Sequence, residues 1–271
     1  MSWWGKLVGG ALGFALVGPI GGLLGAALGH SLDKGIKDLE SIPLDSKFDK
    51  QEDIQAAFFT ATFSIMGHVA KADGKVTESE IKVAQDIMQK MQLNDDQRKL
   101  AINLFTQGKQ SDFDPISVLK QFKKVSSRRS NLLTMFMEIQ LSTALADSEL
   151  HKNEQKVLLN IAEELGFKRS QFEQLLARSS AQRSYSSYQR YAPEKKNSNQ
   201  VISAAYRVLG VTESCSDTEL KKAYRRLMSQ HHPDKLVSKG LPEEMMKLAT
   251  EKTQEIKDAY ERIKQFRAKQ V

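Results

Sequence analysis

Near its N-terminus the chain has a run of 23 residues, 7–29, without a single charged side chain. As a helix, such a run is long enough to cross the hydrocarbon core of a bilayer, which is about 30 Å thick. Trp3 and Trp4 stand just before it, where indole rings favour the membrane interface. Lysines are sparse ahead of the run and frequent after it: Lys6 before, and Lys34, Lys37, Lys47 and Lys50 behind. This pattern predicts one transmembrane helix, with residues 1–6 outside and the rest of the chain in the cytoplasm.

Eight of these 23 residues are glycine, and several are four positions apart. Small residues at that spacing let two transmembrane helices approach closely and associate in lipid. We expect a homodimer through Gly9, Gly13, Gly18, Gly22, Gly25 and Gly29. Two alternatives stay open. The glycines reflect only a weakly apolar span kinked at Pro19, or the run is the core of a cleaved signal peptide.

Residues 30–50 read as a short connector of mixed charge, and residues 51–178 show persistent helical periodicity without strand signals. One apolar stripe of this region comprises Ile54, Phe58, Ala61, Ile65 and Val69. The segment 132–143 is apolar enough to be a central buried helix. We expect an all-α domain of roughly six or seven helices, large enough to bury a substantial core.

Two turns of this region echo each other, because Asp73 and Asp147 each end an Ala-x-Ala-Asp sequence and precede a glutamate by seven residues, Glu80 and Glu154. The region resembles the TerB-like domain of tellurite-resistance proteins. That resemblance makes the four carboxylates candidate ligands of a divalent cation. The residues themselves favour helix capping at Thr77 and Glu80 and an ordinary turn after Asp73. We therefore expect no bound metal and no other cofactor.

Residues 179–200 are dominated by Ser, Tyr, Gln, Arg, Lys and Asn, contain Pro193, and show no apolar periodicity. Such composition is typical of a flexible linker. Tyr185, Tyr188 and Tyr191 lie among arginines, which leaves stacking on RNA bases as an alternative.

In the last region, residues 201–271, two amphipathic segments flank a His-Pro-Asp sequence. The first, residues 216–230, begins with the capping-box pair Ser216 and Glu219 and must stop before Pro233, which disfavours helix at its neighbour. Its apolar stripe is Leu220, Ala223, Tyr224 and Leu227, and its basic face is Lys221, Lys222, Arg225 and Arg226. The second segment, 242–263, is also helical in period. We expect an antiparallel helix pair with a stiff, exposed corner.

A shorter helix ending at Gly210 precedes this pair. With it, the sequences Tyr-Arg-Val-Leu-Gly at 206–210, Lys-Lys-Ala-Tyr-Arg-Arg-Leu at 221–227, and Ile-Lys-Asp-Ala-Tyr at 256–260 surround the His-Pro-Asp corner. The region resembles a J-domain. The resemblance implies that His232, Pro233 and Asp234, helped by the basic face, bind a DnaK-type chaperone and stimulate its ATP hydrolysis. This chain would then be no enzyme, because hydrolysis happens in the partner.

The order of membrane span, TerB-like domain, linker and J-domain resembles membrane-anchored DnaJ-like co-chaperones of the DjlA type. It implies a single-pass protein of a bacterial inner membrane. The chain has one cysteine, Cys215, so an intramolecular disulfide and a cysteine-cluster zinc site are both excluded.

Two rival classes of function stay open. One is a membrane-tethered scaffold or envelope-stress sensor acting through the TerB-like domain. The other is a binder of nucleic acid or anionic lipid, suggested by the net charge of +7. A recognition motif for nucleic acid is missing and many acids accompany the basic residues, so we expect no nucleic-acid partner.

Overall fold

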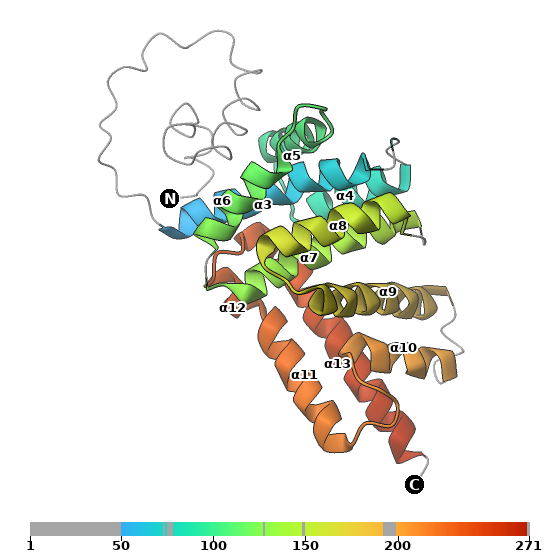
Figure 1. Cartoon of the computed structure of the whole chain (residues 1–271). Coiled ribbons are helices and arrows are strands. Elements are labelled where there is room, and N and C mark those ends of the chain that lie inside the picture. Colours follow the sequence, from blue (N-terminus) through green and yellow to red (C-terminus); the bar gives the residue numbers. More distant parts are fainter. Residues whose placement is uncertain are drawn as a thin grey trace, which may run out of the picture.

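In the computed structural model, the described part of the chain is helical throughout, and the predicted all-α class is confirmed (Figure 1). The described residues are 50–72, 74, 78–126, 128–147, 150–191 and 199–269. The predicted transmembrane helix at 7–29 and its glycines lie outside them. Within the described ranges, no helix combines the length and the apolar character that crossing a membrane requires.

The first part of the described chain is a helical bundle. Its helices are α3 (Lys50–Ala70), α4 (Glu78–Lys90), α5 (Asp95–Gly108), α6 (Pro115–Val125), α7 (Ser130–Ala144), α8 (Lys152–Leu165) and α9 (Arg169–Tyr191), with the 3-10 turn η2 (Leu145–Asp147). Helix α7, predicted from its apolar sequence, is buried along most of its length, and α3 is buried on nearly every side. Phe58 of α3 packs edge-on against Phe122 and Phe136, at ring-centroid distances of 5.8 and 6.3 Å.

Helices α3 and α5 cross with their backbones in contact. A Cβ atom on Gly67 would lie 2.0 Å from the carbonyl oxygen of Phe105, and one on Gly108 would lie 1.8 Å from that of Ser64. Only glycine fits at these two positions, because any side chain would push the helices apart. This close approach fixes the position of α3 within the bundle.

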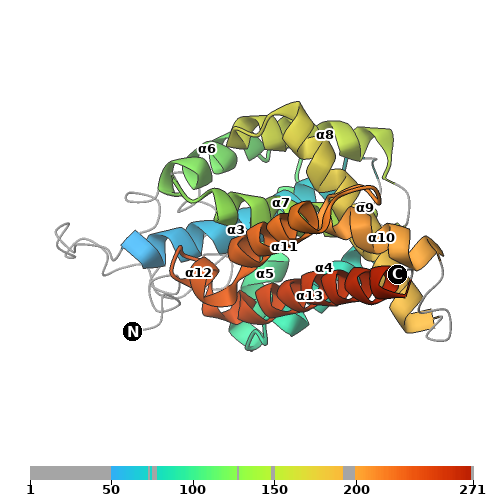
Figure 2. The ribbon, with the colours of Figure 1, turned by 90° about the horizontal axis from the view of Figure 1, so that it is seen from below.

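The remaining helices form the J-like region. They are α10 (Asn199–Leu209), α11 (Asp217–His231), α12 (Pro233–Val237), η4 (Glu243–Met245) and α13 (Met246–Ala268). Helices α11 and α13 lie side by side as the predicted antiparallel pair (Figures 1 and 2). Tyr224 and Tyr260 stack between them, with ring centroids 4.2 Å apart. Gly210 ends α10 with a φ of +68°, a conformation that glycine adopts without strain.

The prediction of a flexible linker at 179–200 is wrong for its first half. Helix α9 continues to Tyr191, and Tyr185 is completely buried in the core of the J-like region. Arg262 of α13 donates a hydrogen bond to the Tyr185 hydroxyl at 2.9 Å. Packing against α10 and α13 offsets the low helix propensity of the serines in this stretch. A buried tyrosine cannot stack on RNA, so Tyr185 is excluded from that alternative, whereas the side chains of Tyr188 and Tyr191 lie outside the described ones.

The J-like region is docked onto the bundle. Four of its apolar side chains belong to the core of the bundle: Leu236, Leu241, Met245 and Ala249. Gln51 at the start of α3 donates a hydrogen bond to the carbonyl oxygen of Val237 in α12 at 3.1 Å. In Figure 2, α12 lies beside the first turns of α3. The shared core gives the two regions a fixed relation instead of the free tether that the composition suggested.

Candidate functional site

Helix α11 is built as its sequence predicts. The Ser216 hydroxyl accepts the backbone N–H of Glu219 at 3.2 Å, and the Glu219 carboxylate accepts the backbone N–H of Ser216 at 2.8 Å. The backbone N–H and the hydroxyl of Ser216 both donate to the Glu219 carboxylate, and these two bonds lower the pKa of Glu219. The stripe of Leu220, Ala223 and Leu227 is buried, and the four basic side chains are exposed: Lys221, Lys222, Arg225 and Arg226. The structure therefore presents the predicted basic face to solvent.

The His-Pro-Asp corner lies at the C-terminal end of α11. The helix ends at His231, and His232 is extended, with φ −58° and ψ 124°. Pro233 then occupies the first position of the short helix α12, where its missing N–H costs nothing. The side chains of His232 and Asp234 are 47% and 84% exposed, with Nδ1 of His232 3.9 Å from Oδ2 of Asp234. The corner is thus exposed, and its Pro233 and Asp234 form the start of a short helix.

The preceding residue has the opposite environment. His231 is 1% exposed, and its two ring nitrogens face two acceptors, the carbonyl oxygen of Leu227 at 3.0 Å and Glu138 Oε2 at 2.9 Å. Both contacts are hydrogen bonds only when the ring carries both protons and a positive charge. Glu138 lies on α7, so this contact joins the end of α11 to the bundle.

Glu138 is the centre of a charged cluster at the junction between the two regions. Its carboxylate also lies 3.3 Å from the guanidinium of Arg178 on α9 and 3.3 Å from Lys252 Nζ on α13. Burial alone would raise the pKa of Glu138, but the positive charges of His231, Lys252 and Arg178 outweigh it and hold that pKa well below its ordinary range. The carboxylate is therefore ionised at neutral pH. Its three basic partners come from α9, α11 and α13, so each of these helices is tied to α7.

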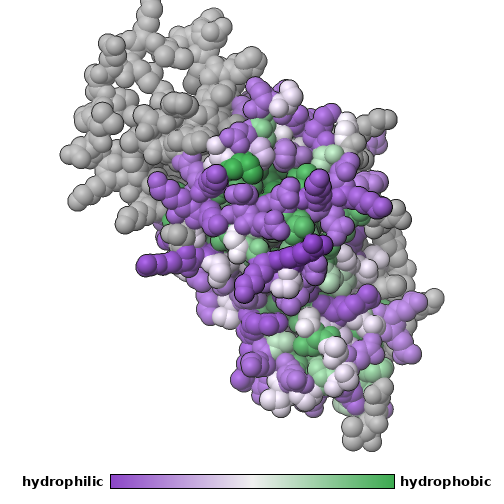
Figure 3. Space-filling model, viewed as in Figure 1, coloured by the Kyte–Doolittle hydropathy of each residue, from purple (hydrophilic) through white to green (hydrophobic). Residues whose placement is uncertain are grey.

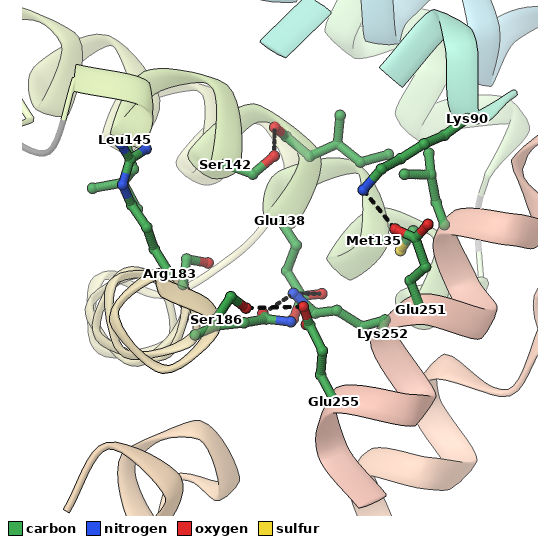
Figure 4. Close-up of a pocket in the computed structure, with 14 residues that line it drawn as sticks. Lys90, Met135, Glu138, Ser142, Leu145, Arg183, Ser186, Glu251, Lys252 and Glu255 are labelled. Carbon is green, nitrogen blue, oxygen red and sulfur yellow. Dashed lines mark hydrogen bonds and ion pairs between the residues drawn. The ribbon is translucent and has the colours of Figure 1, made fainter. Parts of the chain in front are cut away.

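A cavity of about 220 Å³ lies beside this cluster, between α4, α7, α9 and α13 (Figure 4). Lys90 of α4 forms an ion pair with Glu251 of α13 at its edge, with 2.5 Å between the charged atoms. Glu255 accepts a hydrogen bond from the Ser186 hydroxyl at 3.1 Å, and burial raises the pKa of this carboxyl. The charged groups of the cavity pair with one another across the junction, so the cavity is part of the contact between the two regions.

Of the four candidate metal ligands, the structure describes the side chain of Glu154 alone. Glu154 is buried, and its carboxylate accepts the backbone N–H of His151 at 3.0 Å, which is a helix-capping role. Asp73 lies outside the described residues, and the structure does not place the side chains of Glu80 and Asp147. Among the described side chains, no group of three or more His, Cys, Asp or Glu has the arrangement of a metal site. The Glu154 carboxylate thus caps the start of α8.

The face of the molecule in Figure 3 is mostly hydrophilic. On the face in Figure 3, hydrophobic residues form only small, scattered areas. The exposed large hydrophobic side chains in the described ranges are on separate helices: Ile81, Ile102, Ile116 and Met246. The described part of this face therefore has no extended apolar surface.

The sequence analysis missed Glu138 and its partners. The sequence does contain a sign of this cluster: Glu138 is the one charged residue between Ser130 and Ala144, in a segment otherwise apolar enough for a core. A charge in such a position needs a partner, but a sequence does not say from which helix the partner comes.

Three family models match the chain. Residues 1–39 match the co-chaperone DjlA transmembrane domain, residues 59–177 match the tellurite resistance protein TerB, and residues 204–270 match the DnaJ domain. Together they reproduce the predicted order of span, TerB-like domain and J-domain. No solved structure matches the chain.

Curated relatives match over almost the full length. The chain is 45% identical to the co-chaperone protein DjlA of Coxiella burnetii, covering 99% of both chains. It is 43% identical to the protein of that name from Haemophilus influenzae, covering 97% of this chain and 98% of the relative. The DjlA protein of Shewanella oneidensis is also 43% identical, over 98% of this chain. Proteins of this type are J-domain co-chaperones and not enzymes. On this evidence, the chain belongs to the DjlA family of co-chaperones, with an N-terminal transmembrane domain.

Proposed function

We propose that the chain recruits a DnaK-type chaperone to the membrane and stimulates its ATP hydrolysis through His232, Pro233 and Asp234. The observation that carries this proposal is the exposure of the corner at the end of a helix whose basic face is also exposed. Proline fixes the backbone where the partner would read it, so little conformational entropy is lost on binding.

The basic face of α11 would guide the encounter. Its four cations favour an acidic surface on the partner, raise the association rate and orient the corner. The partner's hydrolysing conformation is favoured only if the corner binds that conformation more tightly than the other. This chain supplies no group to the chemical step in the mechanism; it changes the population of partner molecules that are ready to hydrolyse ATP.

The test is the ATPase rate of purified DnaK-type chaperone with full-length protein in lipid nanodiscs. We expect His232→Gln to abolish stimulation without lowering the melting temperature, because the side chain is largely outside the core. His151→Gln, the same change at an exposed histidine of the TerB-like domain, is the matched control and should stimulate normally. Normal stimulation by His232→Gln would refute the proposal.

We also propose that the TerB-like domain and J-domain face the cytoplasm and that the transmembrane helices form a homodimer. The lysines that follow residues 7–29 support this orientation, and ATP for the partner is available there. The glycine spacing supports the dimer. Protease protection in inverted vesicles tests the first proposal. Energy transfer between labelled chains in vesicles tests the second. Gly25→Leu and Gly29→Leu are expected to reduce it, and the control Leu23→Ile, which keeps the side-chain size, is expected to leave it unchanged.

A further inference from the structure

A second hollow lies at the junction, on a different side from the cavity of Figure 4. This groove has a volume of about 640 Å³, within the range typical of ligand sites. One wall comes from α7, the α8–α9 turn and α9 of the TerB-like domain. The other wall comes from the end of α10, the following turn and the end of α11. Neither domain forms the groove alone.

The chemistry of the lining is one-sided. Three arginines line the groove, Arg178, Arg207 and Arg226, and no aspartate or glutamate does. Arg178 is engaged by Glu138, but Arg207 and Arg226 are exposed, and neither makes an ion pair within the described residues. Phe167, Leu175 and Val211 add apolar surface between the charges. Such a lining suits an extended segment that carries carboxylates and aliphatic side chains.

The groove is continuous with the proposed docking face. Arg226 belongs to both, and Gln230 lines the groove two residues before His232. A partner bound to the basic face of α11 would therefore have part of its surface directly over the groove. The Glu138 cluster keeps the two walls together, since Arg178 and His231 reach it from either side.

We infer that this groove binds an acidic, extended segment of the DnaK-type partner, so that the TerB-like domain forms part of the chaperone-docking surface. This inference rests on the proposed function and adds a second contact to it. The TerB-like wall contributes Gln171, Gln174 and Ala177 as exposed residues, outside the J-domain altogether. A charge placed on that wall should change the affinity for the partner without touching the His-Pro-Asp corner.

The test places opposite charges at Gln174 in the full-length protein in nanodiscs. Gln174→Glu should raise the concentration needed for half-maximal stimulation of the chaperone's ATPase about fivefold, and Gln174→Lys should lower it, with the same maximal rate. Both effects should shrink as salt rises. Gln85→Glu, on the exposed side of α4, is the matched control and should change nothing.

The outcomes separate this inference from the proposed function. If both Gln174 variants behave like wild type, or both weaken binding equally, the groove is not a contact for an acidic segment. When His232→Gln abolishes stimulation in the same assay, the proposed function survives that result. When His232→Gln stimulates normally, the proposed function fails whatever Gln174 does.

Discussion

His231 and His232 are neighbours in sequence, and they serve two regions that differ in environment and in partner. His231 is buried at the domain junction and tied to Glu138, whereas His232 is half-exposed at the corner. The junction contributes to stability because its charges are paired away from water. In the proposed function, the corner contributes to recognition because its groups are exposed to another protein. One helix end thus holds a domain in place through His231 and exposes the proposed binding motif at His232.

The largest loss of stability is expected when the charge at the centre of the junction is removed. Glu138→Gln leaves Arg178, His231 and Lys252 without their carboxylate, and we expect a loss of about 3 kcal/mol in the free energy of unfolding. Two of the three cations are partly exposed, at 18% and 19%, which keeps the cost at the lower end for a buried pair. Urea denaturation of the full-length protein measures it.

The maximal stimulation by the folded fraction of Glu138→Gln should persist, because the corner itself is untouched. If this variant were as stable as wild type, the charged cluster would not be a structural tie.

A smaller effect is expected where the chain after α12 meets the bundle. Gly240 has a φ of +100°, and a Cβ there would lie 2.5 Å from Ile54 Cγ2 at the start of α3. Gly240→Ala should therefore destabilise the protein by about 2 kcal/mol, from backbone strain and from the displaced Ile54 together. Thermal unfolding is the measurement.

Gly74→Ala is the matched control for Gly240. Gly74 has a φ of +93° with nothing within 4 Å of its Cβ position, so it carries the backbone strain alone, about 1 kcal/mol. If Gly240→Ala and Gly74→Ala lowered the stability equally, the close contact between Gly240 and Ile54 would add nothing to the packing of the J-like region on the bundle.

Acid should weaken the junction through Glu138. The pKa of Glu138 is lower in the folded protein than its ordinary value of 4.5, so folding favours the deprotonated form. Its contribution to stability is present above about pH 4.5 and is lost as the pH falls toward the folded value. Unfolding between pH 5 and about pH 3 should show a steeper loss in wild type than in Glu138→Gln. If the stability of wild type and of Glu138→Gln fell in parallel with pH, Glu138 would not be the group that weakens the junction in acid.

The smallest effect is expected at the edge of the cavity. Burial raises the pKa of Glu255, so its ionised form is disfavoured in the folded state at neutral pH. Glu255→Gln should stabilise the protein by about 0.5 kcal/mol at pH 7, a gain that disappears in acid. Glu251→Gln, which removes the ion pair with Lys90, should give no gain. A loss of stability in Glu255→Gln would show that the charge is needed for the contact with Lys252.

The sequence predicted the local features of the corner because local features depend on neighbouring residues. Ser216 and Glu219 set the start of α11, Pro233 sets its end, and the stripe of Leu220 and Leu227 sets which side is buried. The exposure of the basic face follows from the same periodicity. These signals are contained within about one helix length.

The docking of the two domains could not be predicted in this way. Glu138 stands about 40 residues before Arg178 and about 90 before His231, and no local rule connects them. The polar stretch after residue 178 looked unstructured because serine is a poor helix former, yet Tyr185 and Ala181 bury one side of α9 against α10 and α13. The position of a domain depends on such long-range packing.

The most direct test of the account measures single-turnover hydrolysis of ATP already bound to the DnaK-type chaperone, after mixing with full-length protein carrying His231→Gln or His232→Gln. We predict that His232→Gln gives the unstimulated rate at wild-type stability, and that His231→Gln lowers stability but still accelerates hydrolysis while folded. The account would be contradicted if His232→Gln accelerated hydrolysis as wild type does, or if the two substitutions had the same effect on both rate and stability.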